Sequence, residues 1–229
     1  MNMRILIVLV VLTISVVACS KTNDKTETTD ILKAPTLTTK KLQDSSTNEI
    51  KKDTSLITST IVVTTSKGVF EIGLYGKDAP KTVKNIEELV KSKYYDGMLI
   101  HRIAKGFVIQ FGDPNTKDAS KKSLWGVGGE TWDKNVLQDE LNIQTPSAQR
   151  GYEYGVVAMA TTGIKNSATS QFFICLESAS QLPFLYPIFG KVTKGIDVIK
   201  KISISPIEEN SQGGIPIDPI SITSITLQK

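Results

Sequence analysis

Alternating apolar and polar positions near residue 57 predict the first two strands of a folded domain. In the stretch "STIVVTTSKGVFEIGLYG", two β-type runs flank the turn residues "SKG". In the second run Phe70, Ile72 and Leu74 occupy every other position, so their side chains share one face of a strand. The two runs together predict a β-hairpin.

The pattern changes to a helical period in the next stretch, "DAPKTVKNIEELVKSKYYDG". Asp78 is a candidate N-cap residue, and Pro80 lies early enough to be tolerated in the first turn. Apolar residues then recur on one helical face, at Val83, Ile86, Leu89 and Val90. This stretch predicts an amphipathic helix.

The remaining apolar runs are short and predict further strands. "MLIHRIAKGFVIQFG" reads as a second hairpin, and "GVVAMA", "SQFFICL", "YPIFGKV" and "ISITSITL" are single strands. "GIDVIKKI" predicts a short second helix. Residues 114–155 are polar, contain "WGVGGETW" and predict long loops. Many short strands with only two helices favour an all-β barrel or sandwich over residues 57–229.

The N-terminal segment has a different character. Ile5 to Val17 form an apolar run after Arg4. This run is shorter than the roughly 20 residues that span a bilayer and fits an export signal. The following "VVACS" resembles the lipobox of bacterial lipoproteins, which implies a signal peptide over 1–18 and a lipid-modified Cys19. An uncleaved or ordinarily cleaved export signal is the alternative. The lipoprotein reading implies a lipid-anchored protein in a bacterial cell envelope, at the outer membrane or the periplasmic face in a Gram-negative organism.

Residues 19–56 predict a disordered tether. Thirteen of the 37 residues from Ser20 to Leu56 are Ser or Thr, and none is aromatic. Such a segment buries too little apolar surface to offset the entropy of ordering it. The alternative is a folded first subdomain.

Charge and cysteine content exclude several function classes. The net charge of +4 is modest and lysines alternate with acids, so no basic stripe for nucleic acid is present. Cys19 and Cys175 lie far apart, and no cysteine–histidine cluster has metal-ligand spacing. We therefore expect no metal, no cofactor and no internal disulfide framework, and we expect a monomer.

Three blocks of sequence carry a family resemblance over roughly residues 57–228: "APKTVKNI" with "YYDG", "HRIAKGFVIQFGDP", and "NSATSQFFICL" with "FGKV". In this order and spacing they resemble the cyclophilins, which are peptidyl-prolyl cis–trans isomerases. The resemblance implies a closed eight-stranded antiparallel barrel capped by two α-helices. It also implies an active site on the outer face of the barrel and proline-containing polypeptides as clients, here exported proteins.

The reaction explains why so few polar residues are needed. Rotation about a prolyl bond breaks amide resonance, at a barrier of roughly 20 kcal/mol. The prolyl nitrogen becomes pyramidal and basic, so a fixed donor near it stabilises the twisted state more than the planar ones. An arginine suits this role because it stays charged and presents several donors. An apolar pocket must hold the proline ring.

The resemblance assigns roles to residues that match the family pattern. Arg102 matches the catalytic arginine, and Gln110 matches the glutamine that orients it. The other matching positions are substrate-binding ones: Phe107, Phe173 and Leu182 around the proline, Met159 behind them, Tyr186 closing the pocket, Ala160 and Thr161, whose backbone binds the substrate residue that precedes the proline, and Gln171 in the neighbouring groove. Val108 is also assigned to substrate binding, at a position where methionine is common in the family.

Other residues allow two interpretations. His101, the only histidine, is expected to be a buried, hydrogen-bonded support rather than a general base, and Cys175 an inert core thiol. Phe111 and Thr161 depart from the family pattern and leave room for a non-catalytic peptide-binding or chaperone module. A structural lipoprotein with a vestigial domain is a third possibility. Trp125 and Trp132 either form a client-binding surface or pack within their loop.

The lipobox-like segment generates the first testable prediction. Cys19→Ser should abolish lipid attachment and release the domain from the membrane fraction, because the thiol is the only attachment point in that segment. The measurement is membrane fractionation with intact-mass analysis of the mature chain. An unmodified Cys19 in the mature wild-type protein would overturn the assignment.

Overall fold

The computed structural model describes residues 55–210 and 213–228. The expected signal peptide 1–18, the lipid-modified Cys19 and nearly all of the tether 19–56 lie outside these residues and stay predictions. The end of that tether belongs to the domain, since Leu56 is buried in an apolar cluster with Tyr75. Among the described residues, no helix combines the length and the apolar character needed to cross a membrane.

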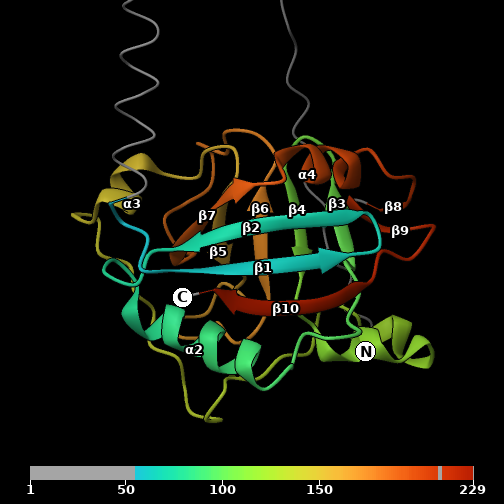
Figure 1. Ribbon diagram of the computed structural model, residues 1–229, viewed down its shortest axis with the longest axis horizontal. Helices are drawn as coiled ribbons and strands as arrows, with labels where there is room; N and C mark the ends of the chain where they lie inside the picture. Colours follow the sequence, from blue (N-terminus) through green and yellow to red (C-terminus); the bar gives the residue numbers. More distant parts are fainter. Residues whose placement is uncertain (1–54, 211–212, 229) are drawn as a thin grey trace, which may run out of the picture. The chain divides into compact units, whose positions relative to one another are not determined.

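The described residues form one antiparallel sheet of ten strands (Figure 1). In spatial order the strands are β10 (Ile222–Gln228), β1 (Ser59–Thr65), β2 (Gly68–Leu74), β7 (Ile188–Lys194), β5 (Val156–Met159), β6 (Phe172–Cys175), β4 (Val108–Phe111), β3 (Arg102–Ala104), β9 (Gly213–Pro216) and β8 (Ile207–Asn210). The expected hairpins are β1–β2 and β3–β4. The all-β antiparallel class is thus confirmed.

The sheet differs from the expected barrel in strand number and in closure. Residues 207–216 fold into an additional hairpin, β8–β9, which joins β3 through the pair Ile103 and Gly214. The ladder of named strands is open between β8 and β10. Within the described residues, an isolated antiparallel bridge between Leu99 and Ser221, with backbone hydrogen bonds such as Ile222 N to Met98 O at 2.8 Å, connects the segment before β3 with the start of β10. The hairpin occupies the edge of β3 along which an eight-stranded barrel would have to close.

Both expected helices are present. They are α2 (Pro80–Lys91) and α4 (Ile196–Ser203), which lie at opposite ends of the sheet in Figure 1. The long loop region contains the short helix α3 (Pro146–Arg150) and the 3-10 helices η1 (Pro114–Lys117) and η2 (Ala119–Leu124).

The N-terminus of α2 is capped from a distant loop. Ala79 is the N-cap residue and makes no side-chain cap, so the expectation for Asp78 is wrong. Glu140 instead accepts hydrogen bonds from Lys81 N at 3.0 Å and Thr82 N at 2.8 Å. Asp78 accepts from Ser147 N at 2.9 Å, at the start of α3. A carboxylate near free helical N–H groups is stabilising. Glu140, which precedes α3, therefore stabilises the start of α2, and Asp78, which precedes α2, stabilises the start of α3.

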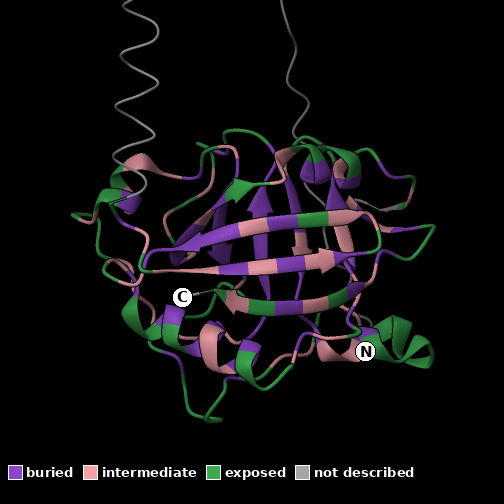
Figure 2. Ribbon diagram, viewed as in Figure 1, coloured by how far each residue is buried: buried purple, intermediate pink, exposed green. Residues whose placement is uncertain are grey.

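Side-chain alternation divides the apolar residues into two clusters. On β6, Phe172 and Ile174 belong to the larger cluster inside the sheet, while Phe173 and Cys175 belong to a second cluster. All four residues of β5 and all four of β6 are accordingly buried (Figure 2). The second cluster, which also holds Val108 and Ala158, supplies an apolar base for a surface site.

The capping by Glu140 generates a stability prediction. Glu140→Ala should lower the free energy of unfolding by about 1 kcal/mol, because two N–H groups of α2 lose their acceptor. Chemical denaturation measures this. The control is Glu130→Ala, because Glu130 is exposed and lies 3.9 Å from Lys134. Equal stability of the two variants would contradict the capping role.

Candidate active site

Cross-strand register places a row of side chains on one face of the sheet. Arg102 on β3 is paired with Gln110 on β4, Gln110 with Phe173 on β6, and Phe173 with Ala158 on β5. Directly opposed residues of an antiparallel ladder point to the same face. The guanidinium, an amide and an aromatic ring are therefore neighbours, although the chain segments carrying them lie up to 71 positions apart (173 − 102).

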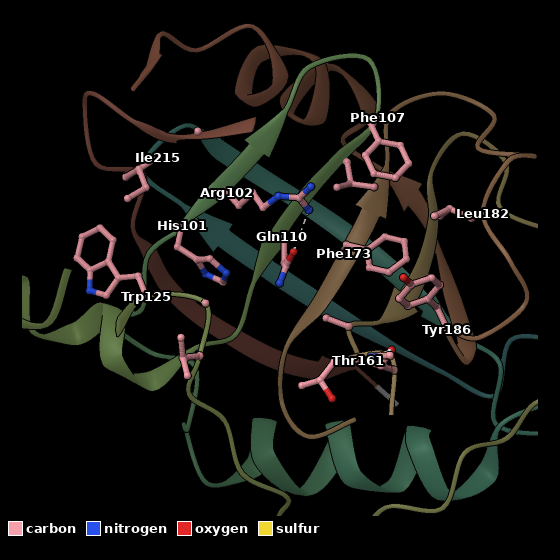
Figure 3. Close-up of a pocket in the computed structure, with 17 residues that line it drawn as sticks. His101, Arg102, Phe107, Gln110, Trp125, Thr161, Phe173, Leu182, Tyr186 and Ile215 are labelled. Carbon is pink, nitrogen blue, oxygen red and sulfur yellow. Dashed lines mark hydrogen bonds between the residues drawn. The ribbon is translucent and has the colours of Figure 1, made fainter. Parts of the chain in front are cut away.

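A cavity of about 700 Å³ lies over this row (Figure 3). One group of lining residues consists of positions predicted from the sequence: Arg102, Phe107, Val108, Gln110, Ala160, Thr161, Phe173, Leu182 and Tyr186. Trp125, for which the sequence left a client-binding role open, also lines the cavity. The rest were not predicted as site residues: His101, Gly126, Val127, Thr162, Gly163, Gly214 and Ile215.

Two predicted site residues do not line the cavity. Met159 is fully buried in the interior cluster. Alternation along β5 turns it inward, whereas Ala158 faces outward into the second cluster. Gln171 is also buried and acts behind the cavity wall through hydrogen bonds.

Aromatic packing forms one end of the cavity. The rings of Phe173 and Tyr186 meet edge to face, with centroids 5.5 Å apart. The Tyr152 hydroxyl donates to Tyr186 O at 2.9 Å and accepts from Tyr186 N at 3.1 Å. Tyr152 therefore fixes the backbone of the residue that closes this end. Its position in the loop stretch "RGYEYG" carried no sequence signal for that role.

A chain of side-chain hydrogen bonds holds Arg102. Its Nη1 donates to Gln110 Oε1 at 3.1 Å, and Gln110 Nε2 donates to Gln171 Oε1 at 2.9 Å. Gln171 Nε2 then donates to the backbone carbonyls of Gly126 at 3.0 Å and Gly128 at 2.6 Å. Burial lowers the pKa of Arg102 from its usual value, but an arginine stays protonated at neutral pH. The guanidinium is thus a fixed cationic donor at the cavity wall.

Asp113 binds the backbone N–H groups of the same loop, Gly126–Gly128, which we call the glycine loop. Its carboxylate is fully buried and accepts from Gly126 N at 2.5 Å and from Gly128 N at 3.0 Å. It also accepts from Asn115 N at 2.8 Å, as the N-cap of η1. The sequence signal was present in "FGDP", since Asp before Pro is typical of a helix start, but its long-range acceptor role was not visible.

His101 is buried, as expected, but not hydrogen-bonded as expected. The side chain of Gln171 lies close enough to stabilise the protonated form of the imidazole. Neither ring nitrogen, however, makes a hydrogen bond of normal geometry within the part of the chain described. Burial, the dominant cause, lowers the pKa of His101 to about 4, with a smaller lowering by Arg102 and an opposing effect of Asp113. The imidazole is therefore uncharged at neutral pH.

Phe111, one of the departures from the family pattern, is accommodated without a left-handed backbone conformation at its own position. Phe111 is buried and packs on Phe172, with ring centroids 4.4 Å apart. The left-handed conformation falls on the next residue, Gly112, with φ of 102°, where glycine is retained.

Burial raises the pKa of the Cys175 thiol to about 12, which supports its interpretation as an inert core thiol.

No group of three or more His, Cys, Asp or Glu residues suited to a metal ion occurs within residues 55–210 and 213–228. The chemistry available at the cavity is that of one cationic donor, uncharged polar groups and an apolar wall.

Comparison with known proteins identifies the family. The family model described as "Cyclophilin type peptidyl-prolyl cis-trans isomerase/CLD" matches residues 60–227. The chain belongs to this family. A crystal structure of a Cryptosporidium parvum cyclophilin type peptidyl-prolyl cis-trans isomerase superposes with a TM-score of 0.64 at 30% identity, covering 75% of this chain and 98% of the other. The fold is therefore cyclophilin-like.

Individual relatives differ in how much of their length is matched. "Peptidyl-prolyl cis-trans isomerase CYP18-2" of Arabidopsis thaliana is 36% identical over 62% of this chain and 79% of its own length. "Peptidyl-prolyl cis-trans isomerase-like 1" of Mus musculus is 35% identical over 71% of this chain and 88% of its own length. "Peptidyl-prolyl isomerase CWC27" of Cryptococcus neoformans is 34% identical over 66% of this chain, which spans only 28% of that relative.

These relatives correct the expected location. They come from a plant, a mammal and a fungus, whereas the "VVACS" segment led to a lipid-anchored protein of a bacterial cell envelope. That expectation is wrong on this comparison. A short apolar run followed by a small residue and cysteine is a weak signal, because few positions define it, while the family match extends over 168 residues (227 − 60 + 1).

The state of His101 generates a pH prediction. Below about pH 6.5 the histidine of the unfolded chain binds a proton, whereas the buried ring resists protonation down to about pH 4. Unfolding then takes up a proton, so the free energy of unfolding should fall as pH falls through this window. The effect is on the order of 3 kcal/mol at most.

The measurement is denaturation of wild type and His101→Gln across that window. The variant should be less stable at neutral pH, because a packed residue is disturbed, and the gap should narrow toward pH 4. A gap that stays constant with pH would show that His101 does not titrate as described.

Proposed function

We propose that the protein catalyses cis–trans isomerisation of X-Pro bonds in polypeptide clients. The observation that carries the proposal is the fixed guanidinium of Arg102, held at 3.1 Å by Gln110 at the edge of an apolar pocket that includes Phe173 and Leu182. A positioned donor beside an apolar ring site is the combination that a twisted prolyl amide requires.

The proline ring occupies the aromatic end of the cavity, against Phe107, Phe173, Leu182 and Tyr186. With the ring held there, the residue before proline rotates, and the prolyl nitrogen becomes pyramidal near Arg102. The backbone of Ala160 and Thr161, which line the cavity, receives that preceding residue. Gln171 acts indirectly, by orienting Gln110. Rotation needs no nucleophile and no proton transfer.

Proline-containing polypeptides are the proposed clients. A cyclophilin from Cryptosporidium parvum that was solved in the presence of the dipeptide Ala-Pro superposes on this chain with a TM-score of 0.63 at 30% identity. The expectation of exported clients followed from the cell-envelope location, which the relatives contradict. The monomeric state stays a prediction.

A non-catalytic peptide-binding module would use the same cavity without needing an oriented arginine. The hydrogen-bond chain from Arg102 through Gln110 to Gln171 favours the enzyme, since binding an apolar ring alone does not require it. A protease-free isomerisation assay on the domain distinguishes the two functions. Peptide binding without turnover would overturn the enzymatic proposal.

Variants at Arg102 test the role of the donor. Arg102→Ala should reduce turnover on the order of ten- to a hundredfold, since a hydrogen bond to a charged group is worth about 1.5–3 kcal/mol. Arg102→Lys should restore activity only in part, because it keeps the charge but loses the planar fork. The assay is isomerisation rate together with the unfolding midpoint.

The matched control is Lys77→Ala, which removes an exposed cation between β2 and α2 and should leave turnover unchanged. If Arg102→Ala keeps wild-type turnover while folding normally, Arg102 does not stabilise the transition state.

A further inference from the structure

The two tryptophans of "WGVGGETW" have different environments. Trp132 is 44% exposed, away from the cavity, with Lys84 Nζ 5.0 Å from its ring centroid. Trp125 is only half-buried but lines the cavity. Trp125 therefore has a ligand-facing position at this cavity, whereas Trp132 is exposed and does not line it.

Trp125 lies at the end of the cavity opposite to the aromatic proline site. In Figure 3, Trp125 and Ile215 stand on one side of Arg102, and Phe107 and Leu182 stand on the other. A volume of about 700 Å³ falls in the range of sites that enclose a ligand of many atoms. One proline ring fills only a part of it, so the second end is available to another side chain of the same peptide.

The wall formed by Trp125 is held rigidly. Its indole Nε1 donates to Asn115 O at 3.1 Å, which leaves only the ring surface for a ligand. The next residue, Gly126, is bonded by Asp113 at its N–H and by Gln171 at its carbonyl. A surface held in advance loses little entropy when a ligand binds.

The facing wall comes from the additional hairpin. Ile215 lies on β9, where its register partner on β8 is Glu208. The Glu208 carboxylate contacts Lys122 Nζ at 2.8 and 2.9 Å, and Lys122 belongs to η2, which ends just before Trp125. Both ion-pair side chains are about half exposed, so the pair adds little stability, but it joins the two elements that carry the walls.

The charges around this end disfavour a charged ligand group. Among the described residues that line the cavity, none carries a carboxylate. The Glu208 carboxylate beside Ile215 is paired with Lys122, so a lysine or arginine of the ligand would meet Arg102 without a free acidic partner. His101 is uncharged at neutral pH because burial lowers its pKa to about 4. Arg102 already donates to Gln110. The indole and the Ile215 side chain offer apolar surface, which is suited to an aliphatic or aromatic side chain.

We propose that Trp125 and Ile215 form a second, apolar subsite that selects clients with a large apolar side chain two residues from the proline. The spacing follows from extended peptide geometry, in which residues i and i+2 point to the same side while the neighbour points away. This inference rests on the proposed isomerase function, since it names the client class of the same site.

The experiment compares peptides with Leu or Ala two residues before and two residues after a central proline. Wild type should show about tenfold higher kcat/KM for Leu at one of these positions. Trp125→Ala and Ile215→Ala should each remove most of that preference, so that the ratio of kcat/KM for the Leu peptide to that for the Ala peptide falls toward one. Trp125→Phe should retain it, because apolar ring surface remains. The control Trp132→Ala should behave as wild type.

Calorimetric measurement of peptide affinity distinguishes failure of the subsite proposal from failure of the isomerase proposal. Equal kcat/KM and equal affinity for Leu and Ala peptides in wild type would overturn the subsite and leave the isomerase function standing. A Trp125-dependent preference in affinity without any turnover would support the subsite and overturn the isomerase function. A preference that survives in both Trp125→Ala and Ile215→Ala would also overturn the subsite.

Discussion

The hydrogen-bond chain that leads from Arg102 through Gln110 and Gln171 to the glycine loop is the constraint on which the site depends. Each glutamine both donates and accepts within this chain, so the guanidinium and the loop cannot be oriented independently. Asp113 bonds the loop from its other side. The loop at Gly126 and Gly128 would otherwise have few packed side chains to hold it, and glycine-rich segments carry a high entropy when free.

A β-sheet can support this site because each strand serves two faces. On β6 the odd and even residues build an inner core and an outer apolar cluster at once. The inner residues give stability through burial, and the outer ones present Phe173 and the row of partners across β4 and β3. The reaction proposed here requires a donor and a ring site rather than a nucleophile. One face of a rigid ladder is sufficient to supply both.

The elements outside the central strands determine how large the cavity is. The β8–β9 hairpin and the loop after η2 bring Ile215 and Trp125 to the far end of the cavity. Neither side chain belongs to the cross-strand row of Arg102, Gln110 and Phe173, although Trp125 adjoins Gly126, to which that row is bonded through Gln171. This division of labour is common where a rigid scaffold carries loops that confer specificity.

The sequence by itself determined the local features of this protein. Period-two runs located the hairpins, helical spacing located α2 and α4, and the alternation of Phe172 and Phe173 correctly assigned them to opposite faces. The order of the motif blocks predicted that Arg102, Gln110 and Phe173 belong to one site, and the strand pairing places them in one cross-strand row. These features depend on neighbours within a few positions or on a recognised order of blocks.

Only the tertiary structure decided the rest. The Glu140 cap on α2, the hold of Tyr152 on Tyr186 and the inward turn of Met159 were absent from any local pattern. So were the ten-stranded open sheet and the burial of the His101 ring without a hydrogen bond of normal geometry to the part of the chain described. The physical reason is distance along the chain: Glu140 lies 58 positions from Thr82, and Tyr152 lies 34 positions from Tyr186. Such hydrogen bonds are chosen by which surfaces meet after the chain has packed, and periodicity carries no information about that choice.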